Sequence, residues 1–145
     1  MPTAIVDADG DVDNNDILTV AGNFTGAAAG NLTDTAGNAN LVYDPATGNI
    51  TLVADGGPNI TSFQLESLAA FIDGNYTSPG GGFGGSFEDV SDSVLGDTDF
   101  SFVGLATLDL GNVLTTGLSL TDLENLLTTA NYGAGLGNSG TLDLS

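Results

Sequence analysis

Five residue types are missing from this chain of 145 residues: lysine, arginine, histidine, cysteine and tryptophan. Without cysteine and histidine, the chain has no thiol nucleophile, no imidazole base, no disulfide and none of the usual zinc ligands. Without lysine, it cannot form a Schiff base with a carbonyl compound. Carboxylates and hydroxyls are the only catalytic groups left, and we therefore expect that the protein is not an enzyme.

The missing cations also limit the partners that the chain can bind. Its 19 acidic residues give a formal net charge of −19, which no side chain opposes. We expect no nucleic-acid partner, because phosphate binding requires lysine or arginine, and anionic membrane surfaces are disfavoured for the same reason. A cation is the expected partner, and calcium is the abundant hard cation outside cells that carboxylate oxygens bind.

Long apolar runs are missing as well. No apolar stretch reaches the roughly 18 residues that a transmembrane helix needs, so we expect no membrane span. Residues 1–6 have neither the charged start nor the apolar middle of a signal peptide, and an exported protein would need a signal outside this chain. Apolar residues make up 41% of the chain, which is enough for the core of one domain of this length.

Short β-prone segments separated by turn residues make up most of the chain. The clearest hairpin joins residues 41–43 to residues 50–53 through DPATGN, where Pro45 presets a turn and Gly48 permits a positive φ. Alternation of apolar and polar residues in ITSFQLE and in DFSFVGLATLDLGNV predicts strands with one buried face. The apolar residues that we expect to face the core are Phe63, Leu65, Phe100, Phe102, Leu108 and Leu110.

One helix is predicted near the C-terminus, in LTDLENLLTTANYG. Thr121 and Glu124 have capping-box spacing, Leu123, Leu126 and Leu127 form an apolar stripe, and Gly133 is the expected end. The predicted fold class is all-β: a β-sandwich or jelly roll with an N-terminal calcium loop segment and one short helix near the C-terminus. The expected division is a loop and assembly segment at residues 1–24, a Gly/Asn-rich linker at 25–40 and the sandwich at 41–145.

The stretch DADGDVDNND, residues 7–16, places five aspartates around one glycine. An EF-hand loop supplies about six calcium ligands, at positions 1, 3, 5, 7, 9 and 12, with glycine at position 6. If Asp9 is at position 5, Gly10 is at position 6 and Asp16 at position 12, whereas position 1 falls on Ile5, which has no side-chain ligand. The predicted ligands are the side chains of Asp7, Asp9, Asp13 and Asp16 and the carbonyl of Asp11. The alternative is a solvated acidic turn that binds nothing specific.

Two weaker patterns leave alternatives open. Asp97 and Asp99 follow Gly96 and either form a second calcium site or stand as ordinary carboxylates at a strand end. A glycosidase pair of Glu88 with one of these aspartates is disfavoured, because the chain has no tryptophan and its three tyrosines are scattered along the sequence. Asn-X-Thr triplets are either glycosylation sites of an exported protein or ordinary turn and strand residues. They begin at Asn23, Asn31, Asn49, Asn59 and Asn75.

Two segments carry a resemblance to known families. DADGDVDNNDILTV resembles the calcium loop and following helix of dockerin-type modules, over about residues 5–24, which is one half of the duplicated module. Most of residues 7–137, including NLVYDPATGNITL and GGFGGSFEDVSDS, is similar to exported bacterial β-sandwich proteins of the exosortase-sorted (PEP-CTERM) type. The resemblance implies an extracellular, β-rich and non-enzymatic protein of the matrix or the cell surface.

These observations predict an extracellular or cell-surface structural protein that assembles with copies of itself into a filament. Sheet edges accept added strands, and calcium at the Asp-rich loop would stabilise the subunit or its interface. A subunit with a charge of −19 resists polymerisation unless cations screen it. The alternative is a calcium-dependent extracellular binding module with a cohesin-like protein or a carbohydrate as its partner. A highly acidic, salt-adapted protein without a specific site is a further alternative.

Overall fold

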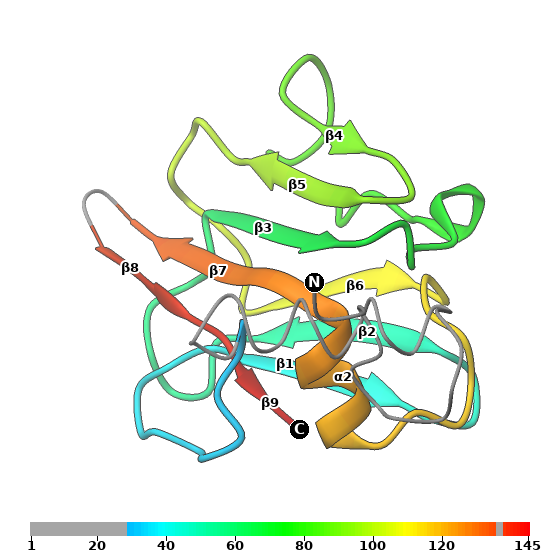
Figure 1. The fold of residues 1–145 in the computed structure, drawn as a ribbon. Coiled ribbons are helices and arrows are strands. Elements are labelled where there is room, and N and C mark those ends of the chain that lie inside the picture. The colour runs from blue at the N-terminus through cyan, green and yellow to red at the C-terminus, as the bar shows by residue number, and fades with distance from the viewer. Residues whose placement is uncertain (1–28, 136–137) are drawn as a thin grey trace, which may run out of the picture.

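Strands dominate the computed structural model, which describes residues 29–135 and 138–145 (Figure 1). A four-stranded sheet has the order β6-β2-β1-β9, with β1 at Asn40–Asp44, β2 at Asn49–Val53, β6 at Thr107–Gly111 and β9 at Asp143–Leu144. A five-stranded sheet has the order β4-β5-β3-β7-β8, with β3 at Ser62–Ser67, β4 at Asp89–Val90, β5 at Val94–Thr98, β7 at Leu127–Ala134 and β8 at Asn138–Thr141. The helix α2 spans Leu120–Leu126, and a 3-10 turn, η1, spans Asp73–Asn75.

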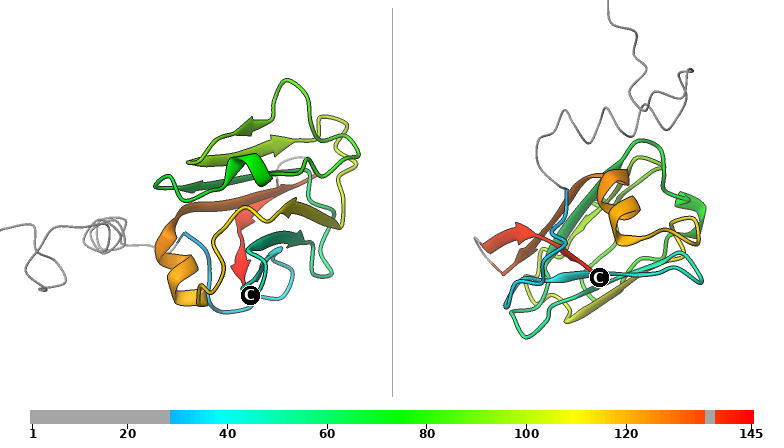
Figure 2. Two further views of the ribbon diagram at one scale, coloured as in Figure 1. Left: turned by 90° about the vertical axis from the view of Figure 1, so that its right-hand side faces the viewer. Right: turned by 60° about the horizontal axis from the view of Figure 1, so that its bottom comes forward.

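The two sheets share one hydrophobic core, so the expected all-β class is confirmed in its coarse form, a β-sandwich-like fold. Figure 2 shows the sheets as separate layers, with α2 at one end of them. The inner faces of both sheets contribute to one buried cluster. Its members include four of the predicted core residues, namely Phe63, Leu65, Leu108 and Leu110.

Two of the predicted core residues are in fact exposed. Phe100 and Phe102 have exposed fractions of 55% and 42%. The strand β5 ends at Thr98, and the chain then turns instead of continuing the alternation. Phe102 adopts a φ of 59°, in the left-handed region that a bulky residue rarely enters. The alternating pattern does not continue past Thr98, so the prediction that both rings face the core was wrong.

The predicted hairpin is confirmed in position, and the structure gives its register. Tyr43 pairs with Ile50, and Asp44 pairs with Asn49. Gly48 has a φ of 78°, as the turn requires. The Asp44 carboxylate accepts hydrogen bonds from the Ala46 N–H at 2.9 Å and the Thr47 hydroxyl at 2.8 Å. These bonds hold the pKa of Asp44 below its usual value and fix the turn.

The helix occurs where it was expected, but its start and its end were predicted wrongly. Ser119 is the N-cap, and a capping box joins it to Asp122, rather than Thr121 to Glu124. The helix ends at Leu126, and the next eight residues form β7, which pairs with β3 over most of its length. Threonine and tyrosine in this stretch favour a strand, and the pairing with β3 outweighs the leucine pattern.

Part of the predicted linker, residues 29–39, lies against the sandwich. The Asn31 N–H donates to the Leu142 carbonyl at 2.9 Å, and the Leu144 N–H donates to the Asn31 carbonyl at 2.7 Å. Ala39 is 1% exposed and belongs to the core. The proposed division at residues 24 and 25 lies outside the described residues and stays a prediction.

Candidate functional site

The predicted calcium loop lies outside the described residues. This applies to Asp7, Asp9, Asp11, Asp13 and Asp16, and to the glycosylation candidate Asn23. Among residues 29–135 and 138–145, no group of three or more acidic side chains is close enough to hold one metal ion. The calcium loop therefore stays a prediction from the sequence.

Asp97 and Asp99, the second calcium candidates, are buried and accept hydrogen bonds from the main chain. Asp97 accepts from the N–H groups of Gly84 at 2.6 Å and Thr98 at 2.7 Å. Asp99 accepts from the N–H and hydroxyl of Ser101, at 2.8 and 2.6 Å, and from the Gly104 N–H at 2.8 Å. In these positions the carboxylates fix two loops, and their assignment to calcium stays a prediction.

The two aspartates have opposite pKa shifts. Burial raises the pKa of Asp97, and the nearby Glu88 carboxylate raises it further, against the effect of the two N–H donors. The Ser101 hydroxyl and the Gly104 N–H lower the pKa of Asp99. The Tyr76 hydroxyl donates to Glu88 at 3.3 Å, and burial together with the Glu88 charge raises the pKa of Tyr76. Asp97, Glu88 and Tyr76 thus form a polar cluster, which the Gly84 N–H joins to the Gly-rich loop, residues 78–87.

The four described Asn-X-Thr asparagines use their side-chain amides inside the fold. Asn31 donates to Asp143 at 3.0 Å, and Asn49 donates to Asp109 at 2.8 Å. Asn59 and Asn75 donate to main-chain carbonyls, those of Val103 at 3.2 Å and Asn112 at 3.0 Å. Each asparagine therefore has a structural role, and glycosylation at these positions stays a prediction.

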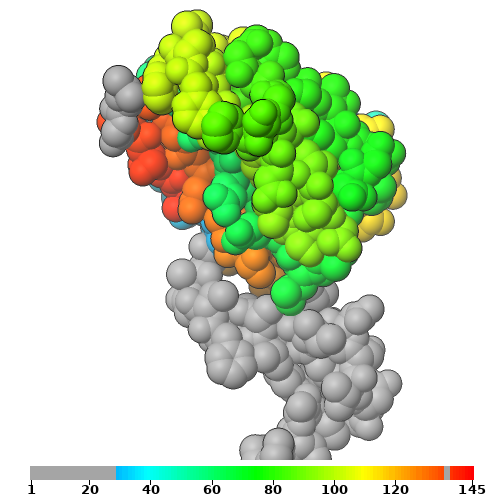
Figure 3. Space-filling model, turned by 90° about the horizontal axis from the view of Figure 1, so that it is seen from above, coloured from blue at the N-terminus to red at the C-terminus, as the bar shows by residue number. Residues whose placement is uncertain are grey.

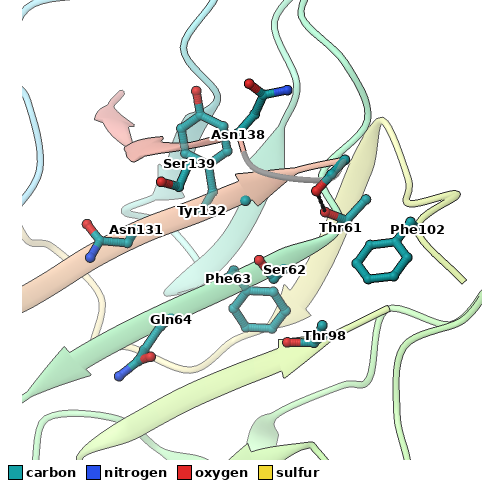
Figure 4. Close-up of a pocket in the computed structure, with 12 residues that line it drawn as sticks. Thr61, Ser62, Phe63, Gln64, Thr98, Phe102, Asn131, Tyr132, Asn138 and Ser139 are labelled. Carbon is teal, nitrogen blue, oxygen red and sulfur yellow. Dashed lines mark hydrogen bonds between the residues drawn. The ribbon is translucent and has the colours of Figure 1, made fainter. Parts of the chain in front are cut away.

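A groove of about 460 Å³ lies on the outer face of the five-stranded sheet, and we call it the outer groove (Figure 4). Ser62 and Gln64 of β3 face away from the core into this groove. The strand register places Thr98 of β5 and Gly133 of β7 beside Ser62, and Asn131 of β7 beside Gln64. The groove was missed from the sequence, although the polar residues that alternate with the core residues of β3 already indicated a polar outer face.

The outer groove is hollow at its centre and carries no charge on its lining. A Cβ atom at Gly133 would fall on the Ser62 hydroxyl, so a side chain there would displace this hydroxyl and occupy part of the space. No charged side chain is among the described residues that line the groove. The side chains of Ser62, Thr98 and Asn131 form no hydrogen bonds with other described residues; Asn131 is exposed, and Ser62 and Thr98 are partly exposed.

Three exposed phenylalanines extend from one end of the outer groove, and we call them the aromatic strip. Phe102 lines the groove, its ring centre lies 6.4 Å from that of Phe100, and the ring centre of Phe100 lies 4.4 Å from that of Phe87. Phe87 is 64% exposed. Figure 3 shows the two segments that carry the strip side by side, the Gly-rich loop in green and the turn after β5 in yellow-green. Such contiguous exposed apolar surface is typical of binding sites.

The strand β8 forms one wall of the outer groove and is also an edge of its sheet. Leu142, just after β8, donates its N–H to the Ala130 carbonyl of β7. Because hydrogen-bonded pairs alternate along an antiparallel ladder, the main-chain groups of Ser139 and Thr141 point away from β7. No described segment forms a main-chain hydrogen bond with this outer side.

Comparison with known proteins gives no match: no family model matches the chain, and no curated protein and no solved structure is similar to it. Across the described part of the chain, every helix is too short or too polar to cross a membrane. Three features of the described residues therefore indicate a function: the outer groove, the aromatic strip and the edge strand β8.

Proposed function

We propose that this protein is an extracellular structural subunit that assembles with copies of itself into a filament. The observation that supports this proposal is the open edge of β8. Its four residues, Asn138–Thr141, carry no charge and no proline. An edge strand with unpaired N–H and C=O groups is a template for a strand from another chain.

The other described edges of the two sheets are protected. β4 has only two residues, one of them an aspartate. On the outer side of β6, the Thr77 N–H donates to the Leu110 carbonyl. At β9, the main chain of Asn31 forms hydrogen bonds with Leu142 and Leu144, the two neighbours of Asp143. Natural β-sheet proteins shield their edges in these ways to prevent association. An unshielded β8 is therefore the position where a second chain would add.

A positive ion is the second requirement of this proposal. Each subunit carries a formal charge of −19, and subunits of like charge repel one another. Calcium at the Asp-rich loop, residues 7–16, would reduce this charge and stabilise the subunit or its interface. The calcium loop, the jelly-roll form of the sandwich, the extracellular location and the absence of enzymatic activity are parts of the same proposal.

Electron microscopy and light scattering of the purified full chain test the proposal. We expect filaments with millimolar calcium, and single particles with a chelator at equal ionic strength. Sodium chloride at the same ionic strength serves as the control for general screening. A protein that remains monomeric at millimolar calcium would contradict self-assembly. Filaments that form equally well in the chelator would contradict the role of calcium.

A pair of substitutions in β8 tests the edge itself. Thr141→Pro removes an outward N–H, whereas Thr141→Val keeps this N–H and changes only the side chain. We expect Thr141→Pro to abolish filament growth and Thr141→Val to preserve it. Ser139→Asp, which adds a negative charge to the same edge, is expected to act like the proline substitution. Circular dichroism confirms that each variant is folded. Filament growth by all three variants would show that the interface does not lie at β8.

The second candidate function is an extracellular binding module, with a cohesin-like protein or a carbohydrate as its partner. The outer groove and the aromatic strip favour this candidate, because concave surfaces that combine aromatic rings with a few placed polar groups are typical of ligand sites. Retention of a ligand by the monomeric protein, in the presence and absence of calcium, distinguishes it from self-assembly.

A further inference from the structure

We propose that the outer groove binds a neutral oligosaccharide, with one sugar ring stacked on Phe102. This inference rests on the second candidate function and specifies its ligand class. The same face of the sheet combines three features that such a ligand requires: uncharged donors and acceptors, a hollow floor and an aromatic ring at the rim (Figure 4).

The charges of the chain and of the groove lining favour a neutral polar ligand over an anion, a cation or an apolar molecule. The chain holds no lysine, arginine or histidine, so an anionic ligand would find no opposite charge. A cation would bind better at carboxylates than at the outer groove, whose described lining has none. An apolar ligand would leave the groups of Ser62, Thr98 and Asn131 without hydrogen bonds. A neutral ligand with many hydroxyls is the class that satisfies these groups.

The hydrogen-bonding groups are held in place by the sheet. Gln64 donates its side-chain N–H to Glu66 at 2.8 Å, which leaves the amide oxygen of Gln64 to accept from a ligand. Asn131 stands beside it on β7, with an amide that offers donors and an acceptor. Side chains on paired strands keep fixed spacings, so the groove is organised before a ligand arrives.

Phe102 is presented to solvent by a strained turn. Its φ of 59° is unusual for a bulky residue, and strain of this kind concentrates at binding sites. The turn is fixed by Asp99, whose carboxylate accepts hydrogen bonds from the N–H groups of Ser101 and Gly104, which precede and follow Phe102 in the sequence. Apolar C–H faces of sugars pack on aromatic rings, and Phe100 and Phe87 continue this surface for further sugar units.

Affinity electrophoresis of the full chain tests this proposal. The gels contain neutral polysaccharides, one in each gel: a β-glucan, a xylan, a galactomannan and a galactan. We expect at least one to retard the protein in the presence of a chelator, the condition in which single particles are expected, relative to a gel without polysaccharide. No retardation in any gel would overturn the proposal. Retardation that needs calcium would place the site at the Asp-rich loop and would also overturn it.

Substitutions then locate the site. We expect Phe102→Ala and Asn131→Ala each to weaken binding by about tenfold, the effect of losing one stacked ring or one pair of hydrogen bonds. Leu68→Ala is the matched control, because Leu68 is an exposed apolar residue, at 51%, outside the groove. Equal binding by all three variants would overturn the proposal.

Amide chemical shifts give a readout that does not depend on removing a side chain. Titration of the wild-type monomer with an oligosaccharide of the retained polysaccharide should shift the amides of Ser62, Asn131 and Phe102. Shifts confined to other segments would overturn the proposal. Sedimentation velocity separates this proposal from self-assembly. Filaments that bind no glycan would contradict glycan binding by the groove. Glycan binding by a protein that remains monomeric would contradict only the proposal of a filament. If Phe102→Ala instead abolishes self-association and wild type binds no glycan, the groove is an interface between copies.

Discussion

Asn31 and Asp143 lie 112 positions apart in the chain, and the Asn31 amide donates a 3.0 Å hydrogen bond to the Asp143 carboxylate. Asp143 is 1% exposed and also accepts from the Thr35 N–H at 2.6 Å and the Asn38 amide at 3.3 Å. In a chain without cations, neutral amides take the place of a salt bridge around this buried charge. One carboxylate thereby attaches residues 31–38 to the C-terminal strand.

We predict that Asp143→Ala lowers the free energy of unfolding by about 2–4 kcal/mol, because it leaves three donors without their charged acceptor. Urea unfolding followed by circular dichroism measures this loss. Asp34→Asn is the matched control, because Asp34 is exposed on the same segment and forms no hydrogen bond with a described residue. A loss below about 0.5 kcal/mol for Asp143→Ala would show that the segment is held by other contacts.

Local patterns predicted the parts of the fold that depend on local chemistry. The hairpin around Gly48 follows from turn residues between two β-prone runs, and the buried face of β3 follows from alternation. The contact of Asn31 with Asp143 could not be predicted, because it depends on how distant strands pair. The same limit applies to residues 127–133, where pairing with β3 converts a helical pattern into a strand.

The candidate site was predictable only in part, for the same reason. Alternation along β3 marks Ser62 and Gln64 as outward, but the hollow beside them depends on Gly133, which reaches their side only through pairing of β7. The exposure of Phe102 depends on a turn held by Asp99, and nothing in an alternating pattern shows where a strand ends. Sites that are assembled from paired strands therefore escape analysis of single segments.

The pH dependence of stability should have two parts of opposite sign. The pKa of Asp97 is raised in the fold, so its burial costs stability at neutral pH, and stability rises as the pH falls through the raised pKa. The pKa of Asp99 is lowered, so its contribution is complete above the unfolded value of about 3.9 and is lost as the pH falls through the folded value.

Thermal unfolding between neutral pH and strongly acidic pH measures both parts. We expect Asp97→Asn to reduce the rise on mild acidification and Asp99→Asn to reduce the loss below about pH 4. Because the other carboxylates also titrate in this range, each variant is compared with wild type at every pH. Parallel curves for wild type and both variants would refute the assignment.

The start of α2 allows a direct comparison of two capping residues. Ser119 accepts from the Asp122 N–H at 3.1 Å, and the Asp122 carboxylate accepts from the Ser119 N–H at 2.9 Å. We predict that Ser119→Ala costs about 1 kcal/mol of stability, whereas Thr121→Ala has little effect. Chemical unfolding measures both. A larger loss for Thr121→Ala would favour the capping box that the sequence alone indicated.

Replacing Phe102 separates backbone strain from ligand binding. At a φ of 59°, glycine is more favourable than alanine, so Phe102→Gly should be more stable than Phe102→Ala by about 1 kcal/mol. Both variants lack the ring and should bind an oligosaccharide equally weakly. Urea unfolding and affinity electrophoresis provide the two measurements. Equal stability of the two variants would show that the turn relaxes when the ring is removed.

Two glycines with positive φ separate the cost of a strained backbone from that of a steric clash. Gly37 has a φ of 89° and open space around it, whereas Gly48 has a φ of 78° and a Cβ there would fall on the Leu114 carbonyl oxygen. We predict a loss of about 1–2 kcal/mol for Gly37→Ala, from the backbone alone. Gly48→Ala should lower the free energy of unfolding by about 1–3 kcal/mol more, because the hairpin must move away from Leu114. This movement would also disturb the hydrogen bond that the Leu114 N–H donates to the Gly48 carbonyl at 3.0 Å. Urea unfolding compares the two, and equal losses would show that the hairpin shifts freely and does not fix the position of the segment around Leu114.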